Sequence, residues 1–386
     1  FFSSRRRHTR SASVSWARNV YKRQGLKNPI GVVFQYAPRP QMVTRVIIKS
    51  HKKPLKVGKE TINIGLIGAG DFARGTILPI LKKFKIVNLK GVATATSHKG
   101  IYVAKKFGFE YHTTDYREIL RDSEIDAVII ATRHKLHAKV VMEALKAGKH
   151  IFVEKPLAVT IDELRGIVKA YNENPRIVMV GFNRRFAPHT IEAKKFIKEY
   201  GDDPLVINIR VNTGYIPKEQ WVHDIMEGTR IIGEICHFVD LAYFFVDADP
   251  IRIYAENITE TEKYLPDDNV QVSIKFRDGS IAHITYVSSG DKSLGRERVE
   301  IYGNGGVAVI DNFRKLILSR DGKRRTRRKF SVDRGHYNEF LTFIEALKGN
   351  AEIDFKGYLI SSLATIKIMD ALKTGEPQRI ELTEIF

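Results

Sequence analysis

The stretch INIGLIGAGDFARG, residues 62–75, decides the fold that we expect for this chain. Its first half is an apolar run of the kind that forms a buried strand, and it ends in glycines. Its second half opens a helical pattern that continues to residue 84 despite Pro79. The motif G-x-G-x-x-A at residues 68–73 lies at the junction, as in strand–turn–helix units that bind dinucleotides. A tight turn without a ligand is the alternative interpretation.

Each small residue of this motif has a physical role in dinucleotide binding. Gly68 permits the tight turn, Gly70 lets the backbone approach a pyrophosphate, and Ala73 allows the helix to pack closely on the strand. The first helical residues, Asp71 and Phe72, present backbone N–H groups to the anion. We therefore expect residues 68 and 70–73 to contact a cofactor.

The acid that usually follows about 20 residues later is missing. The second strand, NLKGVATA (88–95), ends with Thr94 near the position where Asp or Glu would bind the ribose 2′-hydroxyl. Hydroxyl groups would suit NAD, whereas His98 or Lys99 would suit the phosphate of NADP. A solvated lysine at a helix start is the alternative for Lys99, so the cofactor is predicted as NAD or NADP.

Apolar strands and helical segments alternate as far as residue 183, which predicts a Rossmann-type, doubly wound parallel sheet with helices on both faces. After about residue 184, strand-like runs are separated by turn signals such as Asp-Gly and Asn-Gly-Gly. We expect an NAD(P)-binding domain at 61–183 and an α+β domain with an open, mainly antiparallel sheet at 184–386. The apolar strands of the first domain are predicted at 62–70, 88–95, 126–132, 150–156 and 176–182.

The net charge of +20 comes from two short segments. Residues 1–60 hold 15 Lys or Arg and a single acid, Glu60, and residues 314–330 hold nine basic residues and only Asp321. The remainder of the chain is close to neutral, so we do not expect a nucleic-acid-binding fold. The basic segment 320–330 can bind a polyanion or can be a solvated loop on a hairpin.

Residues 1–60 are predicted to be a leader and a linker. FFSSRRRHTRSASVSWARNVYKRQ (1–24) resembles translated sequencing-adapter sequence and is set aside as an artefact, with a transit peptide as the alternative. GVVFQYAP (31–38) resembles the closing strand of a medium-chain alcohol dehydrogenase, as in a fusion protein. The stretch that continues to Lys59 has the composition of a linker.

Cysteine usage and hydropathy indicate the class of protein. Cys236 is the sole cysteine, so no intramolecular disulfide can form. No run of 18 or more apolar residues is present, which argues against a membrane span. We expect a soluble, cytoplasmic protein without a membrane partner.

Glu154-Lys155-Pro156 follows directly after an apolar strand. Ligands of doubly wound sheets bind at the carboxyl ends of strands, which places Lys155 on the same rim as the glycine turn. A lysine there can act as a base on a substrate hydroxyl beside a nicotinamide ring. Pro156 fixes the local backbone and can adopt the cis form. A salt-bridged surface turn is the alternative.

The segment GTRIIGEICHFVDLAYFF (228–245) carries Glu234, His237 and Asp240 at spacings of three. On a helix these side chains share a face, so an acid could orient a histidine that relays a proton. The alternative is a buried helix in which His237 belongs to a hydrogen-bond network. No Cys/His cluster has metal-ligand spacing, so no metal site is predicted, and Cys236 is expected in the core.

Four motifs together resemble the glucose–fructose oxidoreductase, inositol dehydrogenase and MocA (Gfo/Idh/MocA) family. The similarity spans about residues 61–386. It implies a Rossmann domain, a C-terminal domain with an open sheet, and NAD(P)-dependent redox chemistry on sugars, inositols or related substrates. The motifs are GLIGAGDFARG, DAVIIATRHKLHAKVVMEALKAGKHIFVEKPLA, VGFNRRFAP and GTRIIGEICHFVDL.

The resemblance also implies roles for individual residues. Lys155 matches the catalytic lysine and His237 the catalytic histidine, whereas Glu154 matches the contact to the cofactor ribose. The family often has an aspartate four residues before that histidine, where this chain has Gly233, so Glu234 is expected to take its role. The nicotinamide side is expected to contain Ala131, Thr132, His134 and His137, and Asn183 and Arg185 are expected where the second domain meets the cleft. Apart from the resemblance, Tyr215 and His223 are further candidates for substrate contacts, together with Asn183 and Arg185.

The sequence therefore predicts an NAD(P)-dependent dehydrogenase that transfers hydride between nicotinamide and a ring hydroxyl or ketone of a sugar, inositol or related polyol. One alternative is a sugar-nucleotide 3-dehydrogenase of polysaccharide biosynthesis. Another is a cofactor-sensing regulator without catalysis, although the presence of both Lys155 and His237 argues against it. By resemblance, a homodimer or homotetramer is expected.

Overall fold

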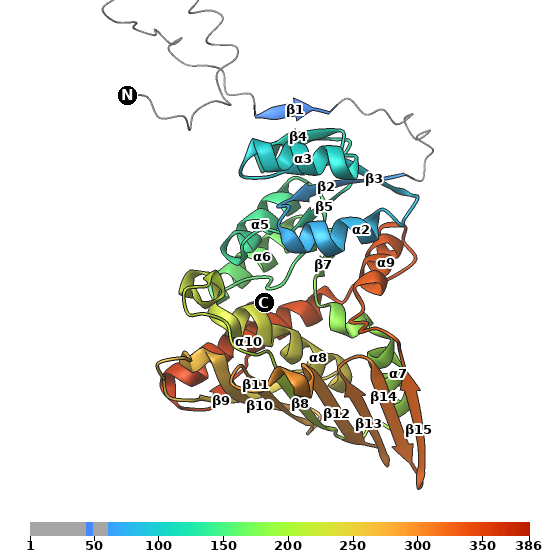
Figure 1. Cartoon of the computed structure of the whole chain (residues 1–386), viewed down its shortest axis with the longest axis vertical. Helices are drawn as coiled ribbons and strands as arrows, with labels where there is room; N and C mark the ends of the chain where they lie inside the picture. Colours follow the sequence, from blue (N-terminus) through green and yellow to red (C-terminus); the bar gives the residue numbers. More distant parts are fainter. Residues whose placement is uncertain (1–43, 49–60) are drawn as a thin grey trace, which may run out of the picture. The chain divides into compact units, whose positions relative to one another are not determined.

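The computed structural model describes residues 44–48 and 61–386 (Figure 1). The leader at 1–24 and the strand expected at 31–38 lie outside the described residues. One part of the predicted linker is not a linker, because Arg45–Ile47 form strand β1 and pair antiparallel with Tyr111–Thr113, strand β4. The sequence pattern did not predict these two strands because each has only three residues.

Sheet A has seven strands in the order β1-β4-β3-β2-β5-β6-β7, and all pairs except β1–β4 are parallel. The order reverses at β2, as in a doubly wound fold. Strands β5, β6 and β7 are almost entirely buried, which explains their continuous apolar sequences. The predicted Rossmann sheet is confirmed, with strands β2 (Ile62–Ile67), β3 (Val87–Ala93), β5 (Ala127–Ile130), β6 (His150–Val153) and β7 (Val178–Val180).

Helices cover both faces of sheet A (Figure 1). Right-handed crossovers place α2 and α3 on one face and α5 and α6 on the other, because the strand order runs in opposite directions on the two sides of β2. Capping fixes some helix starts: the Thr160 hydroxyl accepts the N–H of Glu163 at the start of α6. These elements are η1 (Ala73–Ile77, a π-turn), α2 (Leu78–Leu81), α3 (Ser97–Phe107), α4 (Tyr116–Arg121), η2 (His134–Leu136), α5 (His137–Lys146) and α6 (Ile161–Glu173).

Sheet B has nine strands in the order β15-β14-β13-β12-β8-β11-β10-β9-β16. Its pairs are antiparallel apart from β8 with β11, so the predicted mainly antiparallel sheet is confirmed. Asn304 and Gly305 have φ angles of 51° and 68°, as a two-residue hairpin turn between β12 and β13 requires. The strands are β8 (Val206–Asn212), β9 (Pro250–Asn257), β10 (Asn269–Phe276), β11 (Ile281–Val287), β12 (Glu297–Gly303), β13 (Gly306–Asp311), β14 (Lys315–Arg320), β15 (Lys323–Arg328) and β16 (Gln378–Arg379).

Helices pack on one face of sheet B, and strands such as β10 and β11 alternate buried and more exposed residues. The alternation shows that the opposite face of these strands is not covered by helices within the described chain. The long helices are α7 (Pro188–Lys198), α8 (Cys236–Val246), α9 (His336–Leu347) and α10 (Phe355–Thr374), and the short turns are η3 (Asn183–Phe186), η4 (Trp221–His223), η5 (Ile225–Glu227), η6 (Ile231–Ile235, a π-turn), η7 (Pro266–Asp268), η8 (Lys292–Leu294) and η9 (Leu382–Glu384).

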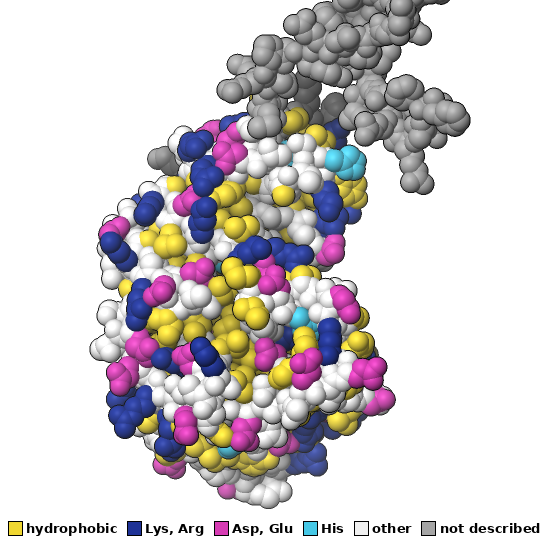
Figure 2. Space-filling view, turned by 90° about the vertical axis from the view of Figure 1, so that its left-hand side faces the viewer, with side chains coloured by type: hydrophobic (Ala, Val, Ile, Leu, Met, Phe, Trp, Pro, Cys, Tyr) yellow, Lys and Arg dark blue, Asp and Glu magenta, His cyan; other side chains and the backbone are white. Residues whose placement is uncertain are grey.

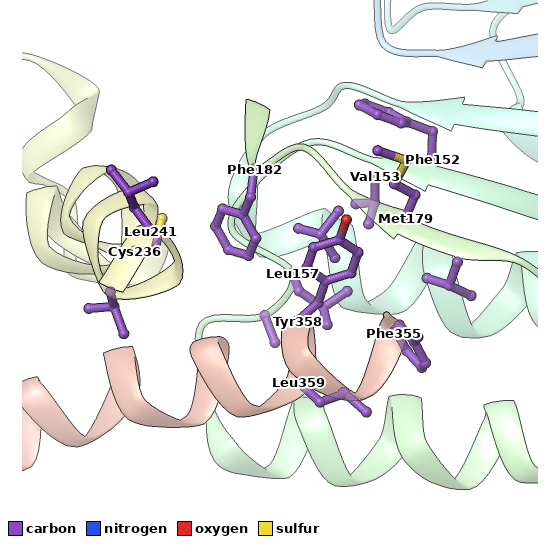
Figure 3. Close-up of a cluster of buried hydrophobic side chains, with 14 of the residues drawn as sticks. Phe152, Val153, Leu157, Met179, Phe182, Cys236, Leu241, Phe355, Tyr358 and Leu359 are labelled. Atoms are coloured by element: carbon purple, nitrogen blue, oxygen red, sulfur yellow. The ribbon is translucent and has the colours of Figure 1, made fainter. Parts of the chain in front are cut away.

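The hydrophobic core continues from sheet A into the C-terminal helices. Tyr358 of α10 lies beside Phe182, at a ring separation of 5.9 Å, and Leu157 and Leu241 belong to the same cluster (Figure 3). Cys236 is also part of it, as expected from the sequence. The domain boundary that we predicted between residues 183 and 184 stays a prediction. Helices α9 and α10 pack against elements that precede this position in the chain and against elements that follow it.

Surface charges of both signs are mixed on the face of the molecule that Figure 2 shows. The positive charge is concentrated on β15, where all six residues of KRRTRR are exposed. This strand lies at the edge of sheet B, so the basic segment is a hairpin strand rather than a loop. Among the described residues, no helix is long and apolar enough to cross a membrane.

We expect Phe340→Ala to destabilise the protein by about 3–5 kcal/mol, the usual range for a buried Phe replaced by Ala. Phe340 is fully buried in α9 and stacks on Phe152 of β6 with ring centroids 4.4 Å apart. Urea unfolding followed by circular dichroism measures the loss. The neighbouring Leu341, which is 37% exposed, supplies the control variant Leu341→Ala. Equal losses for the two variants would show that α9 does not anchor the C-terminal segment to sheet A.

Candidate active site

The glycine turn after β2 has the geometry that its sequence requires. Gly68 has a φ of +92°, and a Cβ at this position would overlap the carbonyl group of Ala131. Gly70 is exposed, and no heavy atom lies within 4 Å of the place where its Cβ would be. The helix that follows starts with exposed Asp71 and Phe72. The turn therefore leaves open space beside the backbone N–H groups where a pyrophosphate would bind.

Lys155 lies at the same edge of sheet A as this turn, because β2, β5 and β6 are parallel neighbours. Its half-buried side chain donates a hydrogen bond from Nζ to the backbone oxygen of Gly233, at 2.5 Å. The Lys155–Pro156 peptide bond is cis, as the sequence allowed. The lysine thus joins the end of β6 to the π-turn η6 of the C-terminal part.

His137 holds the turn that carries Lys155. Its ring is fully buried, and its Nδ1 lies 2.7 Å from the backbone oxygen of Pro156. Its Nε2 lies 3.2 Å from the backbone oxygen of Thr132. Burial lowers the pKa of His137, in part offset by these two carbonyl groups. We predicted a cofactor contact for His137, but both ring nitrogens face backbone carbonyls, so its side chain positions the Lys155 turn.

Glu154 is a half-buried carboxylate next to Lys155. Burial raises the pKa of Glu154 to about 7, although the positive charge of Lys155 acts in the opposite direction. Its carboxylate lies against Gly181, where a Cβ would come within 3.0 Å of Oε2. Glu154 therefore changes its protonation state near neutral pH.

His134 is also buried, and its ring lies edge-on to that of His137 at 5.9 Å. Its Nδ1 is 2.8 Å from the backbone oxygen of Glu227, and its ring packs edge-on against Trp221 at 5.1 Å. Burial and the charge of Lys155 lower the pKa of His134 to about 3, so the ring is neutral. A Cβ on Gly233 would come within 2.9 Å of this ring. An aspartate at position 233 would therefore collide with His134.

His237 is half-buried between two aromatic rings, Phe182 at 5.9 Å and Phe238 at 6.4 Å. Burial lowers its pKa well below the ordinary value, and the charges of Arg184 and Lys155 act in the same direction. Its Nδ1 is buried and has no hydrogen-bond partner within the described chain. A neutral imidazole beside a lysine can accept or donate a hydrogen bond to a substrate hydroxyl.

The expectation that Glu234 orients His237 is wrong. The Glu234 carboxylate instead accepts hydrogen bonds from the Tyr286 hydroxyl at 2.5 Å and from Arg296 at 3.2 Å. The π-turn at Ile231–Ile235 changes the angular spacing on which our prediction rested. Burial alone would raise the pKa of Glu234, but Arg296 and other cations outweigh it and lower the pKa.

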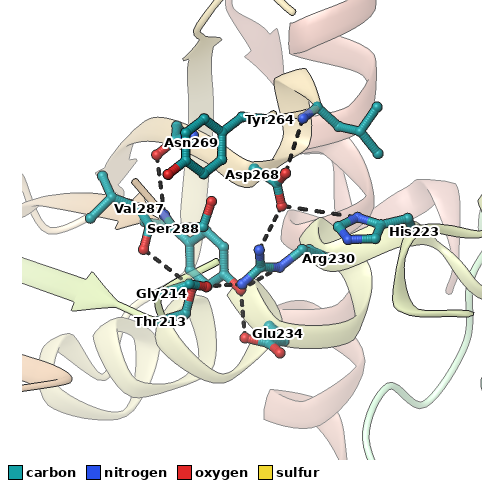
Figure 4. Close-up of polar contacts among 12 residues, drawn as sticks. Thr213, Gly214, His223, Arg230, Glu234, Tyr264, Asp268, Asn269, Val287 and Ser288 are labelled. Carbon is teal, nitrogen blue, oxygen red and sulfur yellow. Dashed lines mark hydrogen bonds and ion pairs between the residues drawn. The ribbon is translucent and has the colours of Figure 1, made fainter. Parts of the chain in front are cut away.

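A polar network extends from Glu234 into the C-terminal part (Figure 4). Arg230 is fully buried and donates to the Tyr286 hydroxyl at 3.0 Å, to Asp268 at 2.5 Å and to Thr213 at 2.6 Å. His223 lies 3.9 Å from the same Asp268 oxygen. The sequence placed Arg230 in an apolar run but gave no sign of its partners, which are 17 to 56 residues away along the chain.

Two of the expected substrate contacts are structural residues. Arg185 is buried and forms a two-pronged ion pair with Asp240, at 2.7 and 2.5 Å, so neither residue is available to a substrate or to His237. Asn183 is buried and donates to the backbone oxygen of Arg334 at 2.7 Å. Both residues lie in η3, just after β7, where the chain passes into the C-terminal part. This place at the junction explains why their motif suggested a position in the cleft.

The remaining predicted residues occupy different environments. Tyr215 is 40% exposed and packs edge-on against Tyr264 at 5.8 Å. The Thr94 hydroxyl donates to the backbone oxygen of Thr96 at 2.9 Å and lies 3.2 Å from His112, so it points inward. His223 is brought into the Arg230 network, whereas Tyr215 and Thr94 contact neither Lys155 nor His237 in the described structure.

A surface hollow of about 1030 Å³ lies away from these residues. Its lining includes Ile62, Asp126 and His150, which stand at or next to the starts of β2, β5 and β6. Doubly wound sheets bind ligands at the opposite, carboxyl edge, so the candidate site is placed there. Among the described residues, no group of three His, Cys, Asp or Glu side chains is positioned to hold a metal ion.

We expect the variant Glu154→Gln to be more stable than the wild type by an amount that grows as the pH rises. Between the ordinary pKa of 4.5 and about 7, the folded protein binds a proton at Glu154 that the unfolded chain has lost, so the stability of the wild type falls through this window. Glutamine cannot ionise, so the stability of the variant does not fall in this way. The difference in Tm between variant and wild type should therefore grow from about pH 5 to about pH 8.

The exposed Glu262 provides the control variant Glu262→Gln, for which this difference should stay constant. A difference that is flat for Glu154→Gln as well would show that the Glu154 carboxyl titrates at its ordinary value.

Comparisons with known proteins agree with this architecture. The family model described as "Oxidoreductase family, NAD-binding Rossmann fold" matches residues 62–182, and that of the GFO/IDH/MocA C-terminal domain matches residues 198–309. The chain is 29% identical over 326 residues to inositol 2-dehydrogenase of Rhizobium meliloti (strain 1021), covering 81% of this chain and 96% of that protein. It is 27% identical over 340 residues to levoglucosan dehydrogenase of Pseudarthrobacter phenanthrenivorans, covering 75% and 85%.

The fold is also shared with solved structures. Levoglucosan dehydrogenase in complex with NADH and levoglucosan superimposes with a TM-score of 0.73 at 23% identity, covering 83% of this chain and 99% of that one. The two family matches confirm the resemblance inferred from the sequence motifs. The chain belongs to the Gfo/Idh/MocA family of oxidoreductases and carries its NAD-binding Rossmann domain.

Proposed function

We propose that this protein transfers hydride between the nicotinamide of NAD and a hydroxyl-bearing ring carbon of a sugar, inositol or related polyol. The observation that carries the proposal is the position of Lys155. It lies at the carboxyl edge of sheet A, on the rim that holds the glycine turn, and reaches across to the segment that leads into His237. Two groups that can exchange a proton thus lie near a cofactor-binding turn.

Lys155 would act as the base toward the substrate hydroxyl. Its Nζ is held by the carbonyl of Gly233, which a substrate hydroxyl can replace as the hydrogen-bond partner. The hydroxyl proton would pass to Nζ as the hydroxyl-bearing carbon loses hydride, and a bound nicotinamide would supply the acceptor for that hydride. His237, a neutral ring, would hold the same hydroxyl by a hydrogen bond and stabilise the oxygen as charge develops.

Other residues would position these groups. His137 fixes the carbonyl of Pro156 and with it the direction of Lys155. Glu154 is proposed to bind the ribose of the nicotinamide, and its pKa of about 7 would fall as the nearby cofactor brings positive charge. His134 and Trp221 form an edge-on pair at 5.1 Å and are proposed to line the nicotinamide side of the cleft.

The polarity of the network around Glu234 supports a hydroxyl-rich substrate. Tyr286 and Asp268 are buried and paired with Arg230, whereas the Glu234 side chain is 23% exposed and offers a fixed acceptor. An unpaired buried polar group costs about 1–3 kcal/mol, so such a site favours ligands that can complete its hydrogen bonds. The named relatives act on inositol and levoglucosan, which are compounds of this kind.

Replacing Lys155 by Met tests the assignment. We expect kcat/KM to fall by at least about 1000-fold, because the base is lost, while the Kd for NADH changes only a few-fold. Initial rates of NAD reduction with a panel of sugars and inositols give the first quantity, and fluorescence titration gives the second.

Lys139, an exposed residue of α5, supplies the matched control Lys139→Met, which should retain wild-type kinetics. Wild-type turnover by Lys155→Met would remove Lys155 from the chemistry. NADH binding without turnover of any polyol, even by the wild type, would favour a cofactor-sensing role.

A further inference from the structure

Three arginines converge on one buried carboxylate next to the candidate active site. Glu297, at the start of β12, accepts two hydrogen bonds from Arg184, at 2.8 and 2.9 Å, and one from Arg334 at 2.9 Å. The Nε of Arg296 lies 3.6 Å from the same carboxylate, and its Nη2 contacts Glu234 at 3.2 Å. The cluster joins the end of β7, the start of β12 and the segment before α9.

The cluster lies close to His237. The pKa of His237 is lowered first by burial and then by the charges of Arg184, Lys155, His336 and Arg296. Such effects are strong only over short distances in a partly buried site. The Arg184 guanidinium lies 4.9 Å from the ring centroid of Phe238, the residue that follows His237. His336 in turn lies beside Phe72 of the glycine turn, at a ring separation of 5.7 Å.

The three arginines are not equivalent. The Arg184 side chain is 8% exposed and uses a two-pronged ion pair, as a structural residue does. The Arg296 and Arg334 side chains are 43% and 26% exposed. A guanidinium carries five N–H donors, and each of these two uses only one in the hydrogen bonds of the described chain. Both therefore keep donors for a ligand.

The charges within the arginine cluster do not balance. Three guanidinium groups contact two carboxylates, Glu297 and Glu234, which leaves one positive charge. The neighbouring histidines add none, because burial lowers the pKa of His134 to about 3 and of His336 to about 4. An uncharged polyol would leave this excess uncompensated, whereas an anionic substrate would neutralise it.

We propose that the substrate carries a carboxylate or phosphate group, which Arg296 and Arg334 bind while Lys155 and His237 act on a hydroxyl. This inference rests on the proposed function, since it names a property of the substrate of that site. Arginine forks match the geometry of both oxyanions and form strong charge-assisted hydrogen bonds. The shared chemistry is an acidic polyol, either a sugar acid or a sugar phosphate.

The test compares anionic and neutral polyols with NAD as the second substrate. D-glucuronate and D-glucose 6-phosphate are the anionic probes, and D-glucose and myo-inositol are the neutral ones. We expect kcat/KM of the wild type to be higher for at least one anionic probe and to fall as salt is added. The anionic probe that is preferred distinguishes a sugar acid from a sugar phosphate.

Arg296→Gln and Arg334→Gln should reduce the ratio of anionic to neutral kcat/KM by about 10- to 100-fold, mainly through KM. Arg296→Lys should recover part of the ratio, because it keeps the charge but not the fork. Arg298 lies on the same strand as Glu297 but pairs with Glu300, and it is 41% exposed. Arg298→Gln is therefore the matched control and should leave the ratio unchanged.

Some outcomes would overturn the inference and leave the proposed function intact. These are a wild-type enzyme that oxidises neutral polyols at least as efficiently as the anionic ones, or arginine variants that weaken NADH binding without changing the ratio. The second result would assign the arginines to the cofactor diphosphate.

Calorimetric titration of the protein–NADH complex with D-glucuronate and D-glucose 6-phosphate gives a readout without turnover. Binding that Arg296→Gln weakens is expected, and it would support the anion site even if no polyol were oxidised. A lack of binding by both anions would overturn the proposal.

Discussion

The continuous core between sheet A and helix α10 is the constraint on which the candidate site depends. Lys155 and His237 are 82 positions apart in the chain and belong to different parts of the fold. Their positions are fixed because Leu157, two residues after the lysine, and Leu241, four after the histidine, share one buried cluster with Tyr358. The packing thus sets the distance between the proposed proton acceptor and its neighbour before any ligand binds.

The repeating part of the fold could be predicted from the sequence because its signals are local. Strands β5 and β6 are continuous apolar runs that lie within the segments predicted at 126–132 and 150–156. The position of Lys155 directly after β6 was also local information, so its place at the edge of the sheet that carries the glycine turn could be predicted. The predictions that failed depended on side-chain direction and on contacts between residues far apart in the chain. The π-turn η6 changes the direction of the Glu234 side chain, and Arg185 pairs with Asp240, 55 residues away.

The histidines and the arginines of the candidate site differ in charge. Its histidines are kept neutral by burial, so they can offer hydrogen bonds but little charge. The positive charge is instead held by guanidinium groups that share too few carboxylates. Arginines keep their charge at every relevant pH, so the charge of this cluster does not depend on the protonation of the neighbouring histidines. None of the arginine partners of Glu297 except its neighbour Arg296 is near it in the sequence, which is why the cluster could not be foreseen.

The basic residues of strand β15 have a consequence for sheet B. It is the last strand of sheet B, so its outer backbone N–H and C=O groups face solvent and could pair with a strand from another molecule. Five of its six residues are Lys or Arg, and two such edges would repel each other. The charge on β15 therefore disfavours edge-to-edge pairing between two copies of this sheet.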